Sequence, residues 1–211
     1  NFYLSALIKS FQDQLPRLII LGLFPVSYLA FLGQSQLVLN ILIRFSTAVG
    51  NVLYPTIASI EEENQKILIQ QTIRISAILN FIFLFFLFLL ARQLVIIIYG
   101  LDYLQIVVYL RILIPSSFVF IIGLLLEQYI NGRGDFRFKI VINLISCISM
   151  ALALLIFYNS LSPEKIAICI AVSHLAYTLT TLFIVVKKYK MQVTSFIPRV
   201  SDISLILQKI S

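Results

Sequence analysis

Long apolar stretches separated by short charged segments make up most of this chain. Four stretches carry no charged residue: 18–43, 75–91, 140–163 and 166–186. Each approaches or exceeds the roughly 17–25 residues that a helix needs to cross a bilayer. Residues 2–24 and 101–130 reach that length if a few charges are admitted. The pattern predicts an all-α integral membrane protein with six transmembrane helices, at about residues 3–24, 27–57, 72–91, 104–130, 138–158 and 164–186.

Composition narrows the class of protein further. Of the 211 residues, 60% are hydrophobic and 12% are charged, and the mean hydropathy is +1.01. A soluble domain of this size needs more polar residues to cover its core. The apolar runs also lack the alternation of a transmembrane barrel. We therefore expect one six-helix membrane lobe over residues 1–190, followed by a tail over residues 191–211.

Basic residues in the connecting segments predict the orientation. Ten of them fall on one side if the segment after the sixth helix is cytoplasmic: Lys66, Arg74, Arg133, Arg137, Lys139, Lys187, Lys188, Lys190, Arg199 and Lys209. The opposite side receives Arg92 and Lys165. Since cytoplasmic loops are enriched in Lys and Arg, the C-terminus is predicted to be cytoplasmic.

The charged segment NGRGDFRFK, residues 131–139, is then a cytoplasmic turn between the fourth and fifth helices. We expect Gly132 and Gly134 to let the backbone reverse there. The segment contains Arg-Gly-Asp, which is an integrin ligand in secreted proteins, but a cytoplasmic location argues against that function.

Residues 194–211 have apolar positions at helical spacing, with charged residues between them. This pattern favours an amphipathic segment in the membrane interface, and a disordered end is the alternative. The net charge of +7 is spread over the segments that flank the membrane. It therefore indicates contact with anionic membrane lipids and no nucleic-acid partner.

The first predicted helix carries polar residues along its whole length. Ser5, Lys9, Asp13 and Arg17 recur every four residues, with Gln12 beside them. An ionised stripe would be costly in lipid, so this face is predicted to line a bundle interior or a water-filled cavity. Asp13 and Arg17 have the spacing of a helical ion pair, so Asp13 is expected to orient Arg17. The alternative is a buried pair that only fixes helix packing.

Three further ionisable residues lie within predicted spans. Arg44 is near the middle of the second, Arg111 is about two turns into the fourth, and Glu127 is close to the cytoplasmic end of the fourth. Arg111 also has the option of extending to the outer interface, and Glu127 that of an interfacial acid. His174 is expected to hydrogen-bond a neighbouring helix rather than relay protons.

The residues form no pattern typical of an enzyme, a metal site or a cofactor site. Cys147 and Cys169 both fall in predicted spans and are interpreted as packing residues. Embedded arginines without a catalytic partner favour the binding of an anionic head group over its chemical conversion.

Several segments, in order, resemble the polysaccharide-biosynthesis flippases. Residues 43–58, with Pro55 near their end, resemble the eighth helix of that family, and residues 91–103 resemble its outward loop with Tyr-Gly. Residues 110–116 are similar to the start of its tenth helix, and residues 131–134 to the glycine-rich turn that ends it. These are the Wzx-type translocases of O-antigen and polysaccharide repeat units, within the multidrug/oligosaccharidyl-lipid/polysaccharide exporter superfamily.

The resemblance implies a fold and a function. Members have twelve or more helices in two lobes, so this chain is expected to be the C-terminal lobe, with a missing N-terminal lobe as its partner. The implied activity is translocation of undecaprenyl-diphosphate-linked oligosaccharides across the bacterial inner membrane, with a polysaccharide polymerase as a further partner. Arg17, Arg44 and Arg111 would contact diphosphate, and Asp13, Gln12 and Glu127 would orient groups or couple transport to an ion. A multidrug/cation antiporter and a structural membrane subunit are the alternatives.

Overall fold

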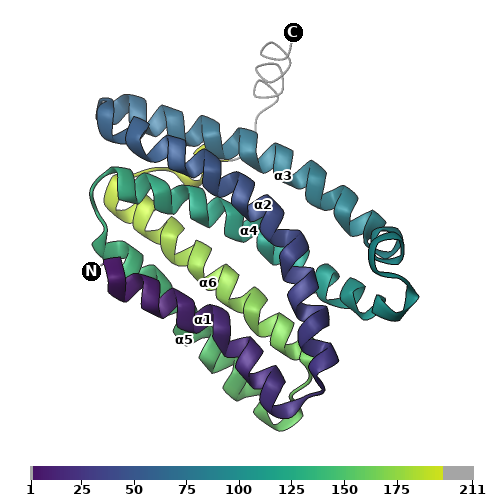
Figure 1. Ribbon diagram of the computed structural model, residues 1–211. Coiled ribbons are helices and arrows are strands. Elements are labelled where there is room, and N and C mark those ends of the chain that lie inside the picture. Colours follow the sequence, from purple (N-terminus) through teal and green to yellow (C-terminus); the bar gives the residue numbers. More distant parts are fainter. Residues whose placement is uncertain (1, 197–211) are drawn as a thin grey trace.

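The computed structural model describes residues 2–196, and in that range the chain folds into six long helices (Figure 1). Three short 3-10 turns follow α3, α5 and α6. The elements are α1 Phe2–Leu23, α2 Val26–Ser59, α3 Glu62–Tyr99, η1 Leu101–Tyr103, α4 Gln105–Gly132, α5 Arg137–Phe157, η2 Tyr158–Ser160, α6 Pro163–Tyr189 and η3 Val193–Phe196. The predicted all-α membrane bundle of six helices is confirmed.

The boundaries follow local chemistry. α6 begins where the Ser162 side chain accepts a hydrogen bond from the backbone N–H of Lys165, 3.3 Å away, with Pro163 in the first helical position. α3 has 38 residues, so the helix continues beyond both ends of the predicted transmembrane span 72–91, which itself stays a prediction. A helix of that length extends about 57 Å, well beyond a hydrocarbon core of roughly 30 Å. Charged residues marked where the apolar span ends, but they do not end the helix.

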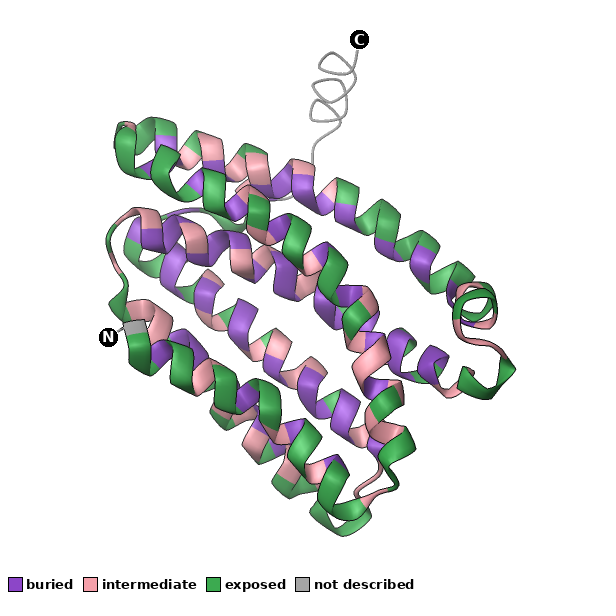
Figure 2. Cartoon of the chain, in the orientation of Figure 1, coloured by how far each residue is buried: buried purple, intermediate pink, exposed green. Residues whose placement is uncertain are grey.

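α4 forms the centre of the bundle. It packs against α2, α3 and α6, whereas α5 packs against α6 and α1. In the most apolar 18-residue window of α4, 61% of the residues are buried, compared with 22% for α2 and for α3. Figure 1 accordingly shows α3 along one edge of the molecule and α1 with α5 along the other, while Figure 2 shows α4 and α6 as the most buried helices.

Five of the described helices, α2 to α6, are long and apolar enough to cross a membrane. Their outer faces carry exposed aromatic and aliphatic side chains, such as Phe83 and Phe86 on α3 and Ile148 and Leu152 on α5. α1 carries Lys9, Asp13 and Arg17 and does not meet the same criterion. That α1 also crosses the membrane stays a prediction.

The charged segment 131–139 contains the turn between α4 and α5, as predicted, and residues 133–136 form that turn. Gly134 has a φ of +79°, a conformation that glycine adopts without strain. Gly132 has a different role from the one expected, because it is the last residue of α4 and packs closely on α2. A Cβ atom at Gly132 would lie 2.8 Å from Cγ2 of Ile57, so only glycine permits this approach.

Side chains of this turn tie three parts of the chain together. Arg133 donates a hydrogen bond to Oε1 of Gln65 (2.7 Å) and forms an ion pair with Glu62 (3.3 Å), both at the start of α3. Asp135 forms an ion pair with Lys188 (2.6 Å) at the end of α6. The turn therefore fastens the α2–α3 connection and the end of α6 at one end of the bundle.

Of the segment 194–211, predicted to be amphipathic, the structure describes residues 194–196. They belong to η3, which contacts α3, and the backbone carbonyl of Ser195 accepts a hydrogen bond from Nε of Arg74 (2.7 Å). The rest of the predicted segment lies outside the described residues.

Candidate functional site

A cavity of about 300 Å³ lies between α1, α2, α4 and α6, with Met150 of α5 contributing to its wall. It is partly open to the exterior. Its lining is rich in polar side chains for a membrane bundle: Lys9, Gln12, Asp13, Arg17, Gln36, Asn40, Thr47, Ser117, Ser173 and His174. This polar lining makes it the candidate binding site.

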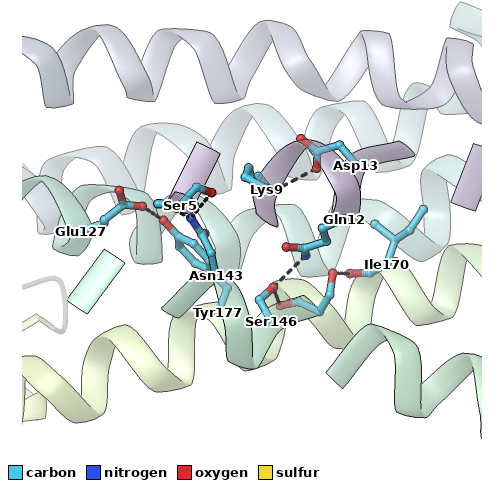
Figure 3. Close-up of polar contacts among 10 residues, drawn as sticks. Ser5, Lys9, Gln12, Asp13, Glu127, Asn143, Ser146, Ile170 and Tyr177 are labelled. Carbon is cyan, nitrogen blue, oxygen red and sulfur yellow. Dashed lines mark hydrogen bonds and ion pairs between the residues drawn. The ribbon is translucent and has the colours of Figure 1, made fainter. Parts of the chain in front are cut away.

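The polar residues of α1 point in two directions (Figure 3). Ser5 and Gln12 are buried against α5, where Asn143 Nδ2 donates to Ser5 Oγ and Gln12 Nε2 donates to Ser146 Oγ, each over 2.8 Å. Lys9, Asp13 and Arg17 line the cavity, and part of Gln12 also reaches the lining. The predicted polar face therefore both lines a cavity and holds α1 against α5.

The charges on α1 pair differently from the prediction. Asp13 forms its ion pair with Lys9, one turn earlier, with 3.1 Å between Nζ and Oδ1. The expected ion pair of Asp13 with Arg17 was therefore wrong. Lys9 and Arg17 each lie one helical turn from Asp13, and the structure pairs Asp13 with Lys9. Within residues 2–196, Arg17 forms no ion pair and lies at the cavity as a cation without a carboxylate partner.

The structure does not bring the other two predicted arginines to this cavity. Arg44 is exposed on α2, and its neighbours Ile43 and Thr47 line the cavity in its place. Arg111 is also exposed, and its guanidinium carbon lies 5.8 Å from the ring centroid of Phe88 on α3. The rotation of each helix about its axis directs these side chains away from the polar lining.

Glu127 is buried and is not among the residues that line the cavity. Its carboxylate is 2.9 Å from Nζ of Lys139 and accepts hydrogen bonds from the Tyr177 hydroxyl and from Nδ2 of Asn131 (3.3 Å). Figure 3 shows the contact with Tyr177. These contacts join α4, α5 and α6, and the interfacial position considered for Glu127 stays a prediction.

Phe120 of α4 and His174 of α6 both line the cavity and contact each other. Their rings stack with centroids 4.4 Å apart, and Lys9 Nζ lies 5.2 Å from the centroid of Phe120. Nδ1 of His174 shares a hydrogen bond with Ser116 Oγ (3.3 Å), which confirms the predicted bond to a neighbouring helix.

Sequence reasoning missed the wall that α2 contributes. Gln36, Asn40, Ile43 and Thr47 all line the cavity, and their spacing places them on one face of a helix. This polar periodicity is present in the sequence, next to Arg44. It was not recognised because a charged residue in mid-span gave the stronger signal.

Two buried polar atoms at the cavity have no hydrogen-bond partner within the described part of the chain. They are Oε1 of Gln12 and Oγ of Ser117, in residues that are 4% and 2% exposed. Buried polar atoms are nearly always hydrogen-bonded, so these two leave unused hydrogen-bonding capacity in the wall of the cavity.

Comparisons with known proteins agree with a transporter fold. An outward-facing multidrug resistance transporter of the MATE family, in the MOP superfamily, matches with a TM-score of 0.75 and 16% sequence identity. The match covers 97% of this chain and 48% of that one, so this chain spans about half the length of the transporter. No curated protein matches.

A family model described as "Polysaccharide biosynthesis protein" matches residues 1–108, just over half of the 211 residues. The matched part contains α1, α2 and α3 and hence two walls of the cavity. Together with the membrane-spanning helices and the transporter fold, this match shows that the chain belongs to the polysaccharide biosynthesis protein family.

Proposed function

We propose that this chain is one lobe of a transporter that moves undecaprenyl-diphosphate-linked oligosaccharide repeat units across the bacterial inner membrane. The translocated repeat units would be used to build surface polysaccharides such as the O-antigen of lipopolysaccharide. The observation that carries the proposal is the polar lining of the cavity between α1, α2, α4 and α6. A sugar–diphosphate head cannot cross hydrocarbon unaided, and a polar cavity within the bilayer lowers that barrier.

Arg17 is the residue that we assign to the diphosphate. A guanidinium remains charged and offers paired donors to phosphate oxygens, and Arg17 has no carboxylate partner within residues 2–196. The amides of Gln36 and Asn40 and the hydroxyl of Thr47, on the facing wall, suit sugar hydroxyl groups.

The proposed mechanism is alternating access with a second, N-terminal lobe. Rocking of the two lobes would open the cavity to the cytoplasmic and periplasmic sides in turn. The C-terminus of this lobe would be cytoplasmic, and a polysaccharide polymerase would consume the translocated unit. The coverage of half of a MATE transporter by this chain supports a second lobe.

The cavity supports an anionic substrate better than a cationic drug. Among its lining residues in the described part of the chain, Asp13 is the one carboxylate, and Lys9 already neutralises it. A site for cations would need an acid that is free to pair with its ligand. A structural subunit would need no polar lining.

The test replaces Arg17 in the full-length transporter. Arg17→Ala should abolish surface polysaccharide at normal protein abundance, and Arg17→Lys should retain part of the export, because the charge remains while the two-point contact is lost. Arg44→Ala is the matched control, an exposed arginine outside the cavity, and should export normally. Wild-type export by Arg17→Ala, or equal loss in both alanine variants, would contradict the assignment.

A further inference from the structure

A second, apolar hollow lies on the other side of α4 and α6. It has a volume of about 600 Å³, with walls formed by α3 and α4, a base formed by α6, and one end closed by Val193 and Phe196. On α4, Phe120 lines the polar cavity and Val119 lines this hollow. On α6, His174 lines the polar cavity and Thr178 lines this hollow. The two central helices therefore separate the polar cavity from the apolar hollow.

A neighbouring hollow of about 550 Å³ continues this surface across α6 to α5. The two hollows share Leu179, Leu182 and Val193, so they form one groove along the outer face of α6. The groove exists because α3 packs on α4 and α5 packs on α6, which leaves part of α6 uncovered between them. All four helices are membrane-spanning candidates, so the groove faces the bilayer.

One end of the groove is basic. Phe183 lines it, and Nζ of Lys187 lies 5.2 Å from the centroid of that ring. Lys190, where the chain turns at the end of α6, is also exposed. Lys188 pairs with Asp135, but within residues 2–196 neither Lys187 nor Lys190 forms an ion pair. The apolar groove thus ends at Phe183 beside Lys187, and the exposed Lys190 follows three residues later in the chain.

We propose that this groove binds an anionic phospholipid of the bilayer, with one acyl chain along α6 and its phosphate on Lys187 and Lys190. An acyl chain fills the apolar part, and a lysine at the membrane interface attracts an anionic head group. The polyprenyl chain of a transported substrate is a poorer fit, since α4 and α6 stand between this groove and the polar cavity. The site is thus a lipid site separate from the transport cavity.

Quenching of a tryptophan by brominated lipid tests the proposal. The chain contains no tryptophan, so Ile82→Trp, at a groove position that is 48% exposed, provides a reporter in the protein reconstituted into nanodiscs. Leu144→Trp is the matched control, since Leu144 is 45% exposed on α5 outside the groove lining. The spectrum of the parent protein is subtracted from each.

At equal mole fractions, brominated phosphatidylglycerol should quench the reporter at position 82 several-fold more than brominated phosphatidylcholine. The two lipids should quench the reporter at position 144 equally. The ratio of quenching by phosphatidylglycerol to quenching by phosphatidylcholine at position 82 should fall to the value at position 144 when Lys187→Gln and Lys190→Gln are combined. These results together would establish selective binding that depends on the lysines.

Three results would overturn the proposal. Equal quenching by the two lipids at position 82 would leave ordinary annular lipid as the occupant. Displacement of brominated phosphatidylglycerol by a small amount of polyprenyl phosphate would assign the groove to a transported substrate. Quenching that requires truncation of the chain after Phe196 would show that the C-terminal segment fills the groove.

Discussion

Gly123 of α4 packs directly against Thr178 of α6. A Cβ atom at Gly123 would lie 2.6 Å from Oγ1 of Thr178 and 3.1 Å from its Cα. The Thr178 hydroxyl has one hydrogen to donate, and the backbone carbonyl oxygens of Val119 and His174 both lie within reach, at 3.0 and 3.1 Å from Oγ1. The two central helices thus approach each other next to the wall that carries Phe120 and His174.

Gly123→Ala should therefore destabilise the protein. The added methyl group has to move Thr178 or separate α4 from α6, and overpacking of this kind costs about 1–3 kcal/mol, more than the roughly 0.5–1 kcal/mol gained in helix propensity. Thermal unfolding followed by circular dichroism measures the effect. Gly22→Ala is the control, because no atom lies within 4 Å of the added Cβ, and it should be neutral or slightly stabilising.

Loss of the Glu127 carboxylate should cost more than loss of an exposed one. Glu127→Ala leaves Lys139 and the Tyr177 hydroxyl without this buried partner, at a cost of about 3–5 kcal/mol. Tyr177→Phe removes one hydrogen bond to a charged acceptor and should cost about 1.5–3 kcal/mol.

The control for this series is Glu62→Ala. The Glu62 side chain is 57% exposed and forms ion pairs with Lys66 and Arg133, so the expected cost is below about 1 kcal/mol. Urea or thermal unfolding in the same detergent ranks the three variants. Equal losses for Glu62→Ala and Glu127→Ala would refute the proposed difference.

Asp135 gives the turn between α4 and α5 a dependence on pH. Burial alone would raise the pKa of its carboxyl group, but hydrogen bonds from Lys188 and Tyr189 outweigh burial and hold the pKa below its usual value of 3.8. A carboxyl group with a lowered pKa stabilises the fold above its unfolded pKa, and this stabilisation is lost as the pH falls through the folded value.

Asp135→Asn should consequently reduce the melting temperature at pH 6. The difference from wild type should narrow only as the pH falls below about 4. Melting curves between pH 3 and 6 test this. Asp102→Asn, at an exposed position in η1, is the control and should follow wild type throughout. A constant difference for Asp135→Asn across this range would contradict the prediction.

Cysteine labelling can test the predicted orientation of the protein in the membrane. Glu63 and Ser160 are both exposed and lie at opposite ends of the bundle, and the native thiols Cys147 and Cys169 are replaced by alanine first. An impermeant maleimide added to intact cells should label Ser160→Cys and should reach Glu63→Cys only after the membrane is disrupted. The reverse pattern would invert the predicted topology.

The number of helices was predictable because apolar run length determines which segments can cross a bilayer. The direction in which individual polar side chains point was harder to predict from the sequence. Four-residue spacing placed Lys9, Asp13 and Arg17 on one face of α1, as the structure has it. It did not reveal that Gln12 turns to Ser146, because that bond depends on where α5 packs.

Arg44 illustrates the limit most clearly. The position of Arg44 near the middle of a predicted span indicated a site, but the direction of its side chain depends on the rotation of α2. That rotation is set by Leu39, Leu42 and Ser46, which are buried against the rest of the bundle. Contacts between helices far apart in sequence decide which side of a helix faces a cavity, and local periodicity does not contain them.

The two walls of the polar cavity are fastened to different parts of the bundle. α1 is hydrogen-bonded to α5, whereas α2 packs on α4, and α1 and α2 contact each other only sparsely across their connection at Phe24 and Pro25. Substitutions in α1 therefore alter the width and chemistry of the cavity without repacking the α2–α4 core. With such a division, the cavity of this scaffold can change in size while its central helices keep the stability that the membrane fold requires.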